Sequence, residues 1–262
     1  MNMSVTFPNS KSKHLNPEQT AEFGRRVDEI RREIMDSLGE QDAKYIYKIR
    51  NFVRYSEIAS RAMLMFGGWI PPVWVVGTGL LGISKIVENM ELGHNVMHGQ
   101  FDWLNDPSLN GANYDWDTMA TGDDWKYTHN YVHHTYTNIV GKDHDVGYGL
   151  LRVSESQKWE PRFLFNIPLA IQLMVFFEWY VGLQNLHLED ALIYKTKTWK
   201  QVWADAAKFR KKARRQILKD YVFFPVIAGP NALPVLAGNA IANVIRSLWS
   251  SAVIFNGHFT ED

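Results

Sequence analysis

Two apolar blocks of equal length dominate the chain, one over residues 56–93 and the other over residues 221–258. Each block is interrupted near its middle by glycine and proline, and each leads into a Gly-His pair, Gly93-His94 or Gly257-His258. A membrane-spanning helix needs about 20 apolar residues, so each block is just long enough for a tight hairpin of two crossings. The pattern therefore predicts two helical hairpins that each present a histidine at their exit.

A third apolar segment, residues 163–183, contains polar side chains and is followed by the basic run at 208–220. If segments 163–183 and 221–258 each crossed the membrane once, the basic run would lie outside, against the preference of lysine and arginine for the cytoplasmic side. We therefore expect 163–183 to lie in the interface or to re-enter, and 221–258 to make both remaining crossings. The predicted fold class is an all-α integral membrane protein with four short transmembrane helices arranged as two hairpins.

The N-terminal part, residues 1–55, has the pattern of polar, amphipathic helices. The first helix begins with an N-cap, a first-turn proline and a capping-box partner, namely Asn16, Pro17 and Gln19. Apolar residues follow at spacings of three and four as far as Gly39, a typical helix stop. The basic and aromatic stretch 40–55 fits either a solvated helix or an interfacial anchor. We expect cytosolic or interfacial helices over residues 1–55 and a separate domain over residues 56–262.

The amino-acid composition limits the kinds of chemistry that the chain can support. The chain has no cysteine, which excludes cysteine-ligated zinc, iron–sulfur clusters, thiol catalysis and disulfides, so a transition metal must be held by histidine and carboxylate. Lysine plus arginine equal aspartate plus glutamate at 28 each, so no overall field points to nucleic acid. Ten tryptophans, 14 phenylalanines and 11 tyrosines suit a protein at a bilayer interface.

Histidines are concentrated between residues 88 and 148. Five of them form an HxxxH motif and an HxxxHH motif: His94, His98, His129, His133 and His134. Residues four apart on a helix share one face, so the two members of each HxxxH pair can converge on one ion. His134 is rotated by about 100° from His133 on a helix and could address a second metal nearby. The spacing predicts a metal centre.

Acidic residues next to these motifs are candidates for orienting the imidazoles. Glu88 and Glu91 approach the first motif from an apolar segment, where an acidic group is costly and therefore usually functional. Asp143 and Asp145 follow the second motif, and we assign them and the intervening His144 supporting or surface roles.

Two further histidines lie outside this region. His258, at the exit of the second apolar block, is a candidate metal ligand because its position matches that of His94 after the first block. His187 could be another ligand, and a loop or surface histidine explains it equally well.

Three kinds of metal site could account for this pattern of histidines. A zinc peptidase needs HExxH, and Asn95 stands where the glutamate is required. A ferritin-like di-iron site needs two Glu-x-x-His pairs; Glu91 and His94 form one, but Lys126 occupies the corresponding place before His129. A histidine-dominated di-iron site remains, and such a centre can activate dioxygen for attack on an inert C–H bond of an apolar substrate.

The stretches GHNVMHGQFDWLNDP and HNYVHHTYTNIVGKDHDVGYG resemble the first and second histidine boxes of membrane fatty acid desaturases, in particular the bacterial acyl-CoA branch of stearoyl-CoA and linoleoyl-CoA type. The resemblance is strongest over residues 88–148 and extends loosely from about residue 50 to 259. It implies four transmembrane helices under a cytosolic helical cap, with the metal site on the cytosolic side of the bacterial cytoplasmic membrane. It also implies that two iron ions are bound by the five clustered histidines, with His258 as an additional ligand near the end of the last membrane helix.

The resemblance implies an oxidoreductase of lipid metabolism and fatty acid biosynthesis. Such an enzyme uses dioxygen and two electrons to remove two hydrogens from a fatty acyl chain, carried by CoA or lipid, and leaves a cis double bond and water. The chain has no haem motif, so the electrons would come from a separate carrier of the ferredoxin or reductase type.

One part of the family pattern is missing from these 262 residues: the third histidine box, QxxHH. We therefore expect the chain alone to be incomplete, to bind at most one iron well and not to desaturate. A histidine-box hydroxylase, an inactive fragment and a membrane metal-binding or transport protein stay open as alternatives. The clusters lie in polar segments outside the apolar blocks, which favours the enzyme.

Overall fold

The computed structural model describes residues 15–258, except that the side chain of His258 lies outside the described part. Every regular element among these residues is helical, with α-helices joined by short π-helical and 3-10 segments, so the all-α prediction is confirmed. Contacts divide the chain into two compact units, Met1–Tyr45 and Ile46–Asp262.

In the first unit, α1 (Pro17–Ser37) has the predicted capping box. The Asn16 side chain accepts a hydrogen bond from the Gln19 backbone N–H at 2.8 Å, and the Gln19 side chain accepts one from the Asn16 N–H at 3.0 Å. These two bonds satisfy donors that a helix start leaves free. Apolar side chains on α1 such as Phe23 and Ile34 are exposed.

The first predicted hairpin consists of α2 (Glu40–Gly67) and α3 (Pro71–Val87). The glycines and prolines at its middle end α2 and start α3, because proline fits the first turn of a helix and not its interior. α2 joins the basic stretch 40–55 and the start of the apolar block in one helix.

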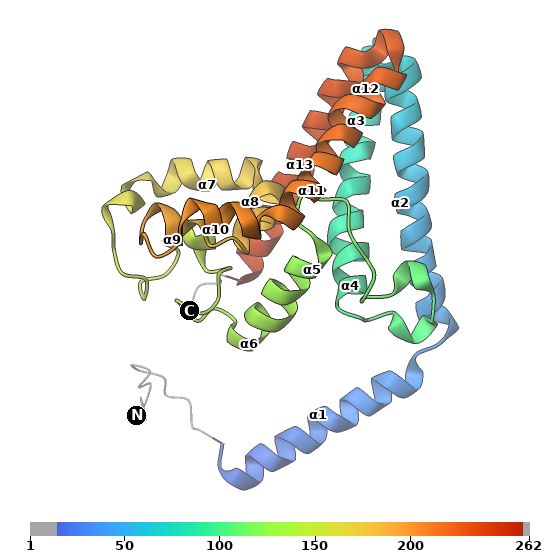
Figure 1. Ribbon diagram of the computed structural model, residues 1–262. Helices are drawn as coiled ribbons and strands as arrows, with labels where there is room; N and C mark the ends of the chain where they lie inside the picture. The colour runs from blue at the N-terminus through green and yellow to red at the C-terminus, as the bar shows by residue number, and fades with distance from the viewer. Residues whose placement is uncertain (1–14, 259–262) are drawn as a thin grey trace. The chain divides into compact units, whose positions relative to one another are not determined.

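The first arm of the second hairpin is a nearly continuous helical run that ends in a turn at Gly229, and the second arm is the long helix α13. The elements of this hairpin are α11 (Ala207–Ile217), η7 (Leu218–Phe223), α12 (Phe224–Ile227), η8 (Gly229–Asn231) and α13 (Ala232–His258). α13 lies along α3 (Figure 1), and the two hairpins share an apolar cluster that includes Leu64, Leu81 and Val235.

The segment 163–183 folds into α7 (Asn166–Val175) and α8 (Phe177–Gln184). By length and apolar content, none of the single helices within residues 15–258 reaches what a membrane crossing requires. One pair, Pro161–Val175 with Phe177–Gln184, does so only when taken together, and it is bent by 95°. The bend agrees with the expectation that 163–183 does not form a straight span, and the four-crossing topology stays a prediction.

The remaining elements are short, and all of them lie between α3 and α11 in the chain. They are η1 (Glu88–Gly93), α4 (His94–Met97), η2 (Asp102–Leu104), η3 (Pro107–Leu109), α5 (Gly122–Trp125), η4 (Lys126–His133), α6 (His134–Tyr136), η5 (Gly147–Gly149), η6 (Pro161–Phe165), α9 (Leu188–Leu192) and α10 (Trp199–Asp205).

A network of buried charges links the two hairpins. Lys85 of α3 donates to Asp117 at 3.1 Å and to Asp220 of η7 at 3.0 Å, and Arg61 of α2 donates to Asp220 at 3.1 Å. Arg246 of α13 pairs with Glu178 of α8 and donates to the backbone carbonyl of Asp117. Buried charges are stable only when they are paired. The network therefore fixes which helices pack together and how they are aligned along their axes.

We predict that Asp220→Ala lowers the free energy of unfolding by roughly 3–5 kcal/mol, because it leaves Lys85 and Arg61 buried without their shared carboxylate. Denaturant titration of the detergent-purified protein measures this. Lys44→Gln is the control, since the Lys44–Glu40 pair is exposed and should contribute nothing measurable. Equal losses for the two variants would contradict a structural role of the network.

Candidate metal centre

The histidine motifs lie where α-helical winding gives way to π-helical winding. η1 runs directly into α4, which begins at His94, and η4 carries His129 and His133 before α6 begins at His134. π-helical turns are rare and occur frequently at functional sites. The first motif keeps the expected α-helical spacing, because the His98 backbone N–H donates to the His94 carbonyl at 3.1 Å. The second motif lies in the π-helical segment, where His129 and His133 stack with ring centroids 5.0 Å apart and planes 15° from parallel.

The structure brings all five predicted histidines of the two motifs together. The Nε2 atoms of His94 and His98 are 3.1 Å apart. The ring of His129 lies 5.1 Å from His94, 5.2 Å from His98 and 4.9 Å from His134. His134 also lies 5.0 Å from His98, so it joins the same cluster instead of pointing elsewhere.

Two carboxylates fix the orientation of the second motif. Asp143 Oδ2 lies 2.8 Å from His133 Nδ1, and Asp145 Oδ2 lies 3.3 Å from the same nitrogen and 3.8 Å from His129 Nδ1. Asp143 is itself held by the backbone N–H groups of Asn138 and Asp145. A carboxylate on one ring nitrogen leaves the other free to face a metal, which is the usual way that proteins orient ligand histidines.

The tryptophan-rich connection between the motifs forms the wall of the centre. Trp125 is buried and stacks on His129 at 4.4 Å, with edge contacts to His94 and His98. Asn130 donates to the Met97 carbonyl at 2.9 Å, which ties the second motif to the first. Sequence reasoning missed both residues, although the density of tryptophan in this connection was a signal.

The connection itself depends on one close backbone approach. A Cβ atom at Gly111 would lie 2.7 Å from the Val96 carbonyl oxygen and 3.1 Å from Gly99, so only glycine fits there. Lys126 of η4 donates to the carbonyl oxygens of Gly111 and Ala112. This packing places the two motifs against each other.

The two motifs differ in how readily their histidines take up a proton. Burial, and then the neighbouring imidazoles, lower the pKa of His94 to about 3 and the pKa of His98 to about 4. For His133, burial opposes protonation, but the hydrogen bond to Asp143 and the charges of Asp145 and Asp143 outweigh it and raise the pKa. Neutral imidazoles at His94 and His98 keep their lone pairs available for a metal at neutral pH.

The donor set fits a transition metal. His94, His98 and His129 offer nitrogen atoms within 4.8 Å of one another, and so do His129, His133 and Asp145 with nitrogen and carboxylate oxygen. Two nitrogens 3.1 Å apart and each about 2.1 Å from an ion would subtend about 95° at it, close to an octahedral angle. Imidazole with carboxylate and no thiolate suits iron.

Four further residues were singled out by the sequence: Glu88, Glu91, His187 and His258. Glu88 accepts hydrogen bonds from the Tyr114 hydroxyl and the Asp117 N–H, so its observed partners are not histidines. Glu91 lies in η1, and its backbone carbonyl accepts from the Asn95 side chain. His258 is the last residue of α13, and its predicted role falls on a side chain outside the described part. His187 lies against His144, with ring centroids 4.3 Å apart.

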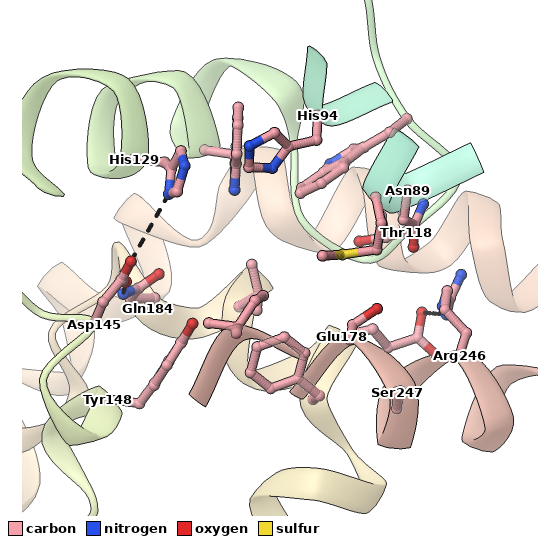
Figure 2. A pocket seen from close by; sticks show the side chains of 17 residues that line it. Asn89, His94, Thr118, His129, Asp145, Tyr148, Glu178, Gln184, Arg246 and Ser247 are labelled. Carbon is pink, nitrogen blue, oxygen red and sulfur yellow. Dashed lines mark hydrogen bonds and ion pairs between the residues drawn. The ribbon is translucent and has the colours of Figure 1, made fainter. Parts of the chain in front are cut away.

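A cavity of about 100 Å³ adjoins the cluster. Figure 2 shows His94 and His129 on one side of it and Glu178, Arg246 and Ser247 across it. Its walls are mainly apolar, with contributions from Met90, Trp116, Trp125, Tyr148, Phe177, Val181 and Ile254. A larger cleft of about 890 Å³ shares Tyr148 and Gln184 with this cavity. The two cavities therefore share part of a wall, and the smaller one reaches His94 and His129.

A family model described as fatty acid desaturase matches residues 67–261. The chain belongs to the fatty acid desaturase family. This confirms the resemblance inferred from the two histidine boxes, and the histidine cluster of this desaturase-family chain lies within the matched region.

Relatives with curated names support the same assignment. A Mycobacterium tuberculosis protein named NADPH-dependent stearoyl-CoA 9-desaturase is 43% identical over 253 residues, which cover 95% of this chain and 58% of that protein. A Synechocystis sn-1 linoleoyl-lipid 6-desaturase is 31% identical over 131 residues, covering 48% of this chain and 36% of that protein. An Arthrospira platensis protein of the same name is 23% identical over 213 residues, covering 78% of this chain and 56% of that protein.

This desaturase-family chain therefore spans less than two thirds of the length of these relatives. No solved structure gives a significant match to it. The expected incompleteness of the chain stays a prediction.

We predict that the metal-free protein loses stability as the pH falls from 6.5 toward 4. In this window the unfolded histidines take up protons, whereas His94 and His98 in the folded protein stay neutral because their pKa values are about 3 and about 4. The unfolded state then binds more protons, so acid favours it. Denaturant titrations across this range measure the slope. The double variant His94→Asn/His98→Asn should flatten it, and an unchanged slope would contradict the lowered pKa values of these two histidines.

We predict that Asp143→Asn weakens iron binding by about 10–100-fold, because His133 loses the carboxylate that orients its ring. Competition with a coloured chelator measures the affinity. Asp123→Asn is the matched control, since the Asp123 side chain is 70% exposed and forms ion pairs with Lys126 and Lys208. The same affinity in both variants would rule out an orienting role for Asp143.

Proposed function

We propose that this chain forms the membrane-embedded catalytic part of an acyl desaturase, an oxidoreductase of lipid metabolism that introduces a cis double bond into a fatty acyl chain. The observation that carries the proposal is the cluster of five histidines facing an apolar-walled cavity in a chain of the fatty acid desaturase family. The reaction takes two hydrogens from adjacent methylene groups, and dioxygen with two electrons and two protons leaves as two waters.

We propose that His94, His98, His129, His133 and His134, with His258, contribute to holding two iron ions. Iron bound there would supply the activation of dioxygen that an unactivated C–H bond requires. Burial keeps His94 and His98 neutral, Asp143 and Asp145 orient His133, and Trp125 stacks on His129 and walls off the cluster.

The cavity supports a fatty acyl substrate. Its apolar lining suits methylene groups. The neighbouring cleft of about 890 Å³ is lined in part by Phe176, Trp179 and Leu183, and it would be the path by which an acyl chain reaches the cavity. Apolar walls with few polar groups are typical of sites for such ligands. The name of the Mycobacterium tuberculosis relative supports acyl-CoA, and the names of the cyanobacterial relatives support acyl lipid.

The name of the Mycobacterium tuberculosis relative also supports NADPH as the source of electrons. We propose that a separate carrier of the ferredoxin or reductase type delivers them on the cytosolic side, where the histidine cluster would lie.

Membrane integration is supported by exposed apolar side chains at the turns of both hairpins. Phe66 and Trp69 at the first turn and Val226 and Leu233 at the second are 82%, 64%, 70% and 63% exposed. Such surfaces are costly in water and favourable in a bilayer. The proposed arrangement has four crossings with the histidine cluster at the cytosolic ends.

The test is oxygen uptake and product analysis with stearoyl-CoA, NADPH, a reductase and the protein expressed from its complete gene. We expect a cis-unsaturated product that requires iron, and His98→Ala should lower its formation by at least about 100-fold through loss of a metal ligand. Glu155→Gln, an exposed loop position, is the control.

Other outcomes would identify the alternatives. A hydroxylated product in place of the unsaturated one would assign the chain to the histidine-box hydroxylases. Metal uptake without oxygen consumption for any acyl substrate would favour a metal-binding or transport protein.

A further inference from the structure

A second group of metal-ligating side chains lies outside the cluster described above. His144, in the loop after the second motif, and His187, before α9, face each other with ring centroids 4.3 Å apart at 70°. Glu189 Oε1 lies 3.6 Å from His144 Nδ1 and 3.8 Å from His187 Nδ1. The three side chains offer ligand atoms within 4.8 Å of one another.

We propose that His144, His187 and Glu189 form a second, mononuclear site for a divalent transition ion such as Zn²⁺. Two histidines and one glutamate, with a position left for water, are an established zinc ligand set. The site rests on its own geometry and does not depend on the proposed desaturase reaction.

The distances favour ligands around an ion over simple hydrogen bonds. Hydrogen bonds from a ring nitrogen to a carboxylate are about 2.7–3.2 Å long, so 3.6 and 3.8 Å are too long for either histidine. Ligand atoms about 2.1 Å from a tetrahedral ion lie about 3.4 Å apart, so a small inward movement of the side chains would complete the site.

Two residues beside the site have left-handed backbone conformations. His187 has φ of 48°, in the left-handed region that costs an ordinary residue free energy. Gly149 has φ of 66°, and a Cβ atom there would lie 3.2 Å from the Glu189 carboxylate. Both conformations place the loop and α9 so that the carboxylate faces the two imidazoles.

The surroundings favour a cation and give it access. His144 and His187 side chains are 35% and 34% exposed, so an ion can reach them from solvent. A cavity of about 420 Å³ opens onto the site, and four carboxylates outnumber two cationic side chains in its lining: Asp143, Glu160, Glu189 and Asp190 against Lys158 and Arg162. Arg162 is already paired with Glu160 at 2.8 Å.

The position of the site suggests what an ion does there. His144 lies between Asp143 and Asp145, the two carboxylates that contact His133 of the main cluster. Tying His144 to His187 and Glu189 therefore ties this loop to α9. An ion at the second site would hold both carboxylates in place and so support the main centre from outside.

The test is equilibrium dialysis of the purified 262-residue chain in detergent against buffered Zn²⁺, with bound zinc counted per chain by mass spectrometry. We expect Glu189→Gln and His187→Asn each to bind about one zinc fewer than wild type at low free zinc. Asparagine is chosen at 187 because it tolerates the left-handed conformation. Glu155→Gln, an exposed loop carboxylate, should bind as much zinc as wild type.

A second measurement is hydrogen exchange of peptides covering residues 141–150. Zinc should slow their exchange in wild type and in His98→Ala, but not in Glu189→Gln, because only the last variant lacks the second site. Equal zinc content in wild type, Glu189→Gln and His187→Asn, or equal protection of this loop, would overturn the proposal. The variant His98→Ala tests the two sites separately. If it loses desaturation but zinc still slows exchange of residues 141–150, the second site is intact, whatever reaction the main cluster supports.

Discussion

Buried ion pairs between the hairpins hold this molecule together. Lys85 reaches both Asp117 and Asp220, and Arg246 reaches Glu178 and the carbonyl of Asp117. A charge in an apolar interior is strongly unfavourable unless its partner is in place, so the pairs admit one alignment of the helices. Asp117 lies on the connection between the two histidine motifs. The same contacts that align the hairpins therefore position the metal centre.

The candidate metal centre combines two opposite electrostatic settings. On one side, burial among other imidazoles keeps His94 and His98 neutral. On the other, Asp143 and Asp145 stabilise positive charge near His133. A cation bound between them would receive lone pairs from the first side and charge compensation from the second.

The acidic loop after the second motif is the point where the two groups of ligands meet. Asp143 and Asp145 turn toward the main cluster, and the residue between them, His144, turns toward His187 and Glu189. Gln184 at the end of α8 donates to Asp145, which ties the loop to the wall of the cavity. A short segment thus couples the centre to the helices beside the apolar cleft.

The sequence by itself determined the all-helical class, the two hairpins with their Gly-Pro turns, the capping box of α1 and the five clustered histidines. These follow from local rules of spacing, capping and turn chemistry. Tertiary structure alone decided that η1 and η4 wind as π-helices, that Trp125 walls the cluster, and that Glu88 faces Tyr114 and Asp117. It also decided that His144 and His187, 43 positions apart in the chain, lie in contact. Such contacts depend on how distant segments pack, which the pattern along one segment does not encode.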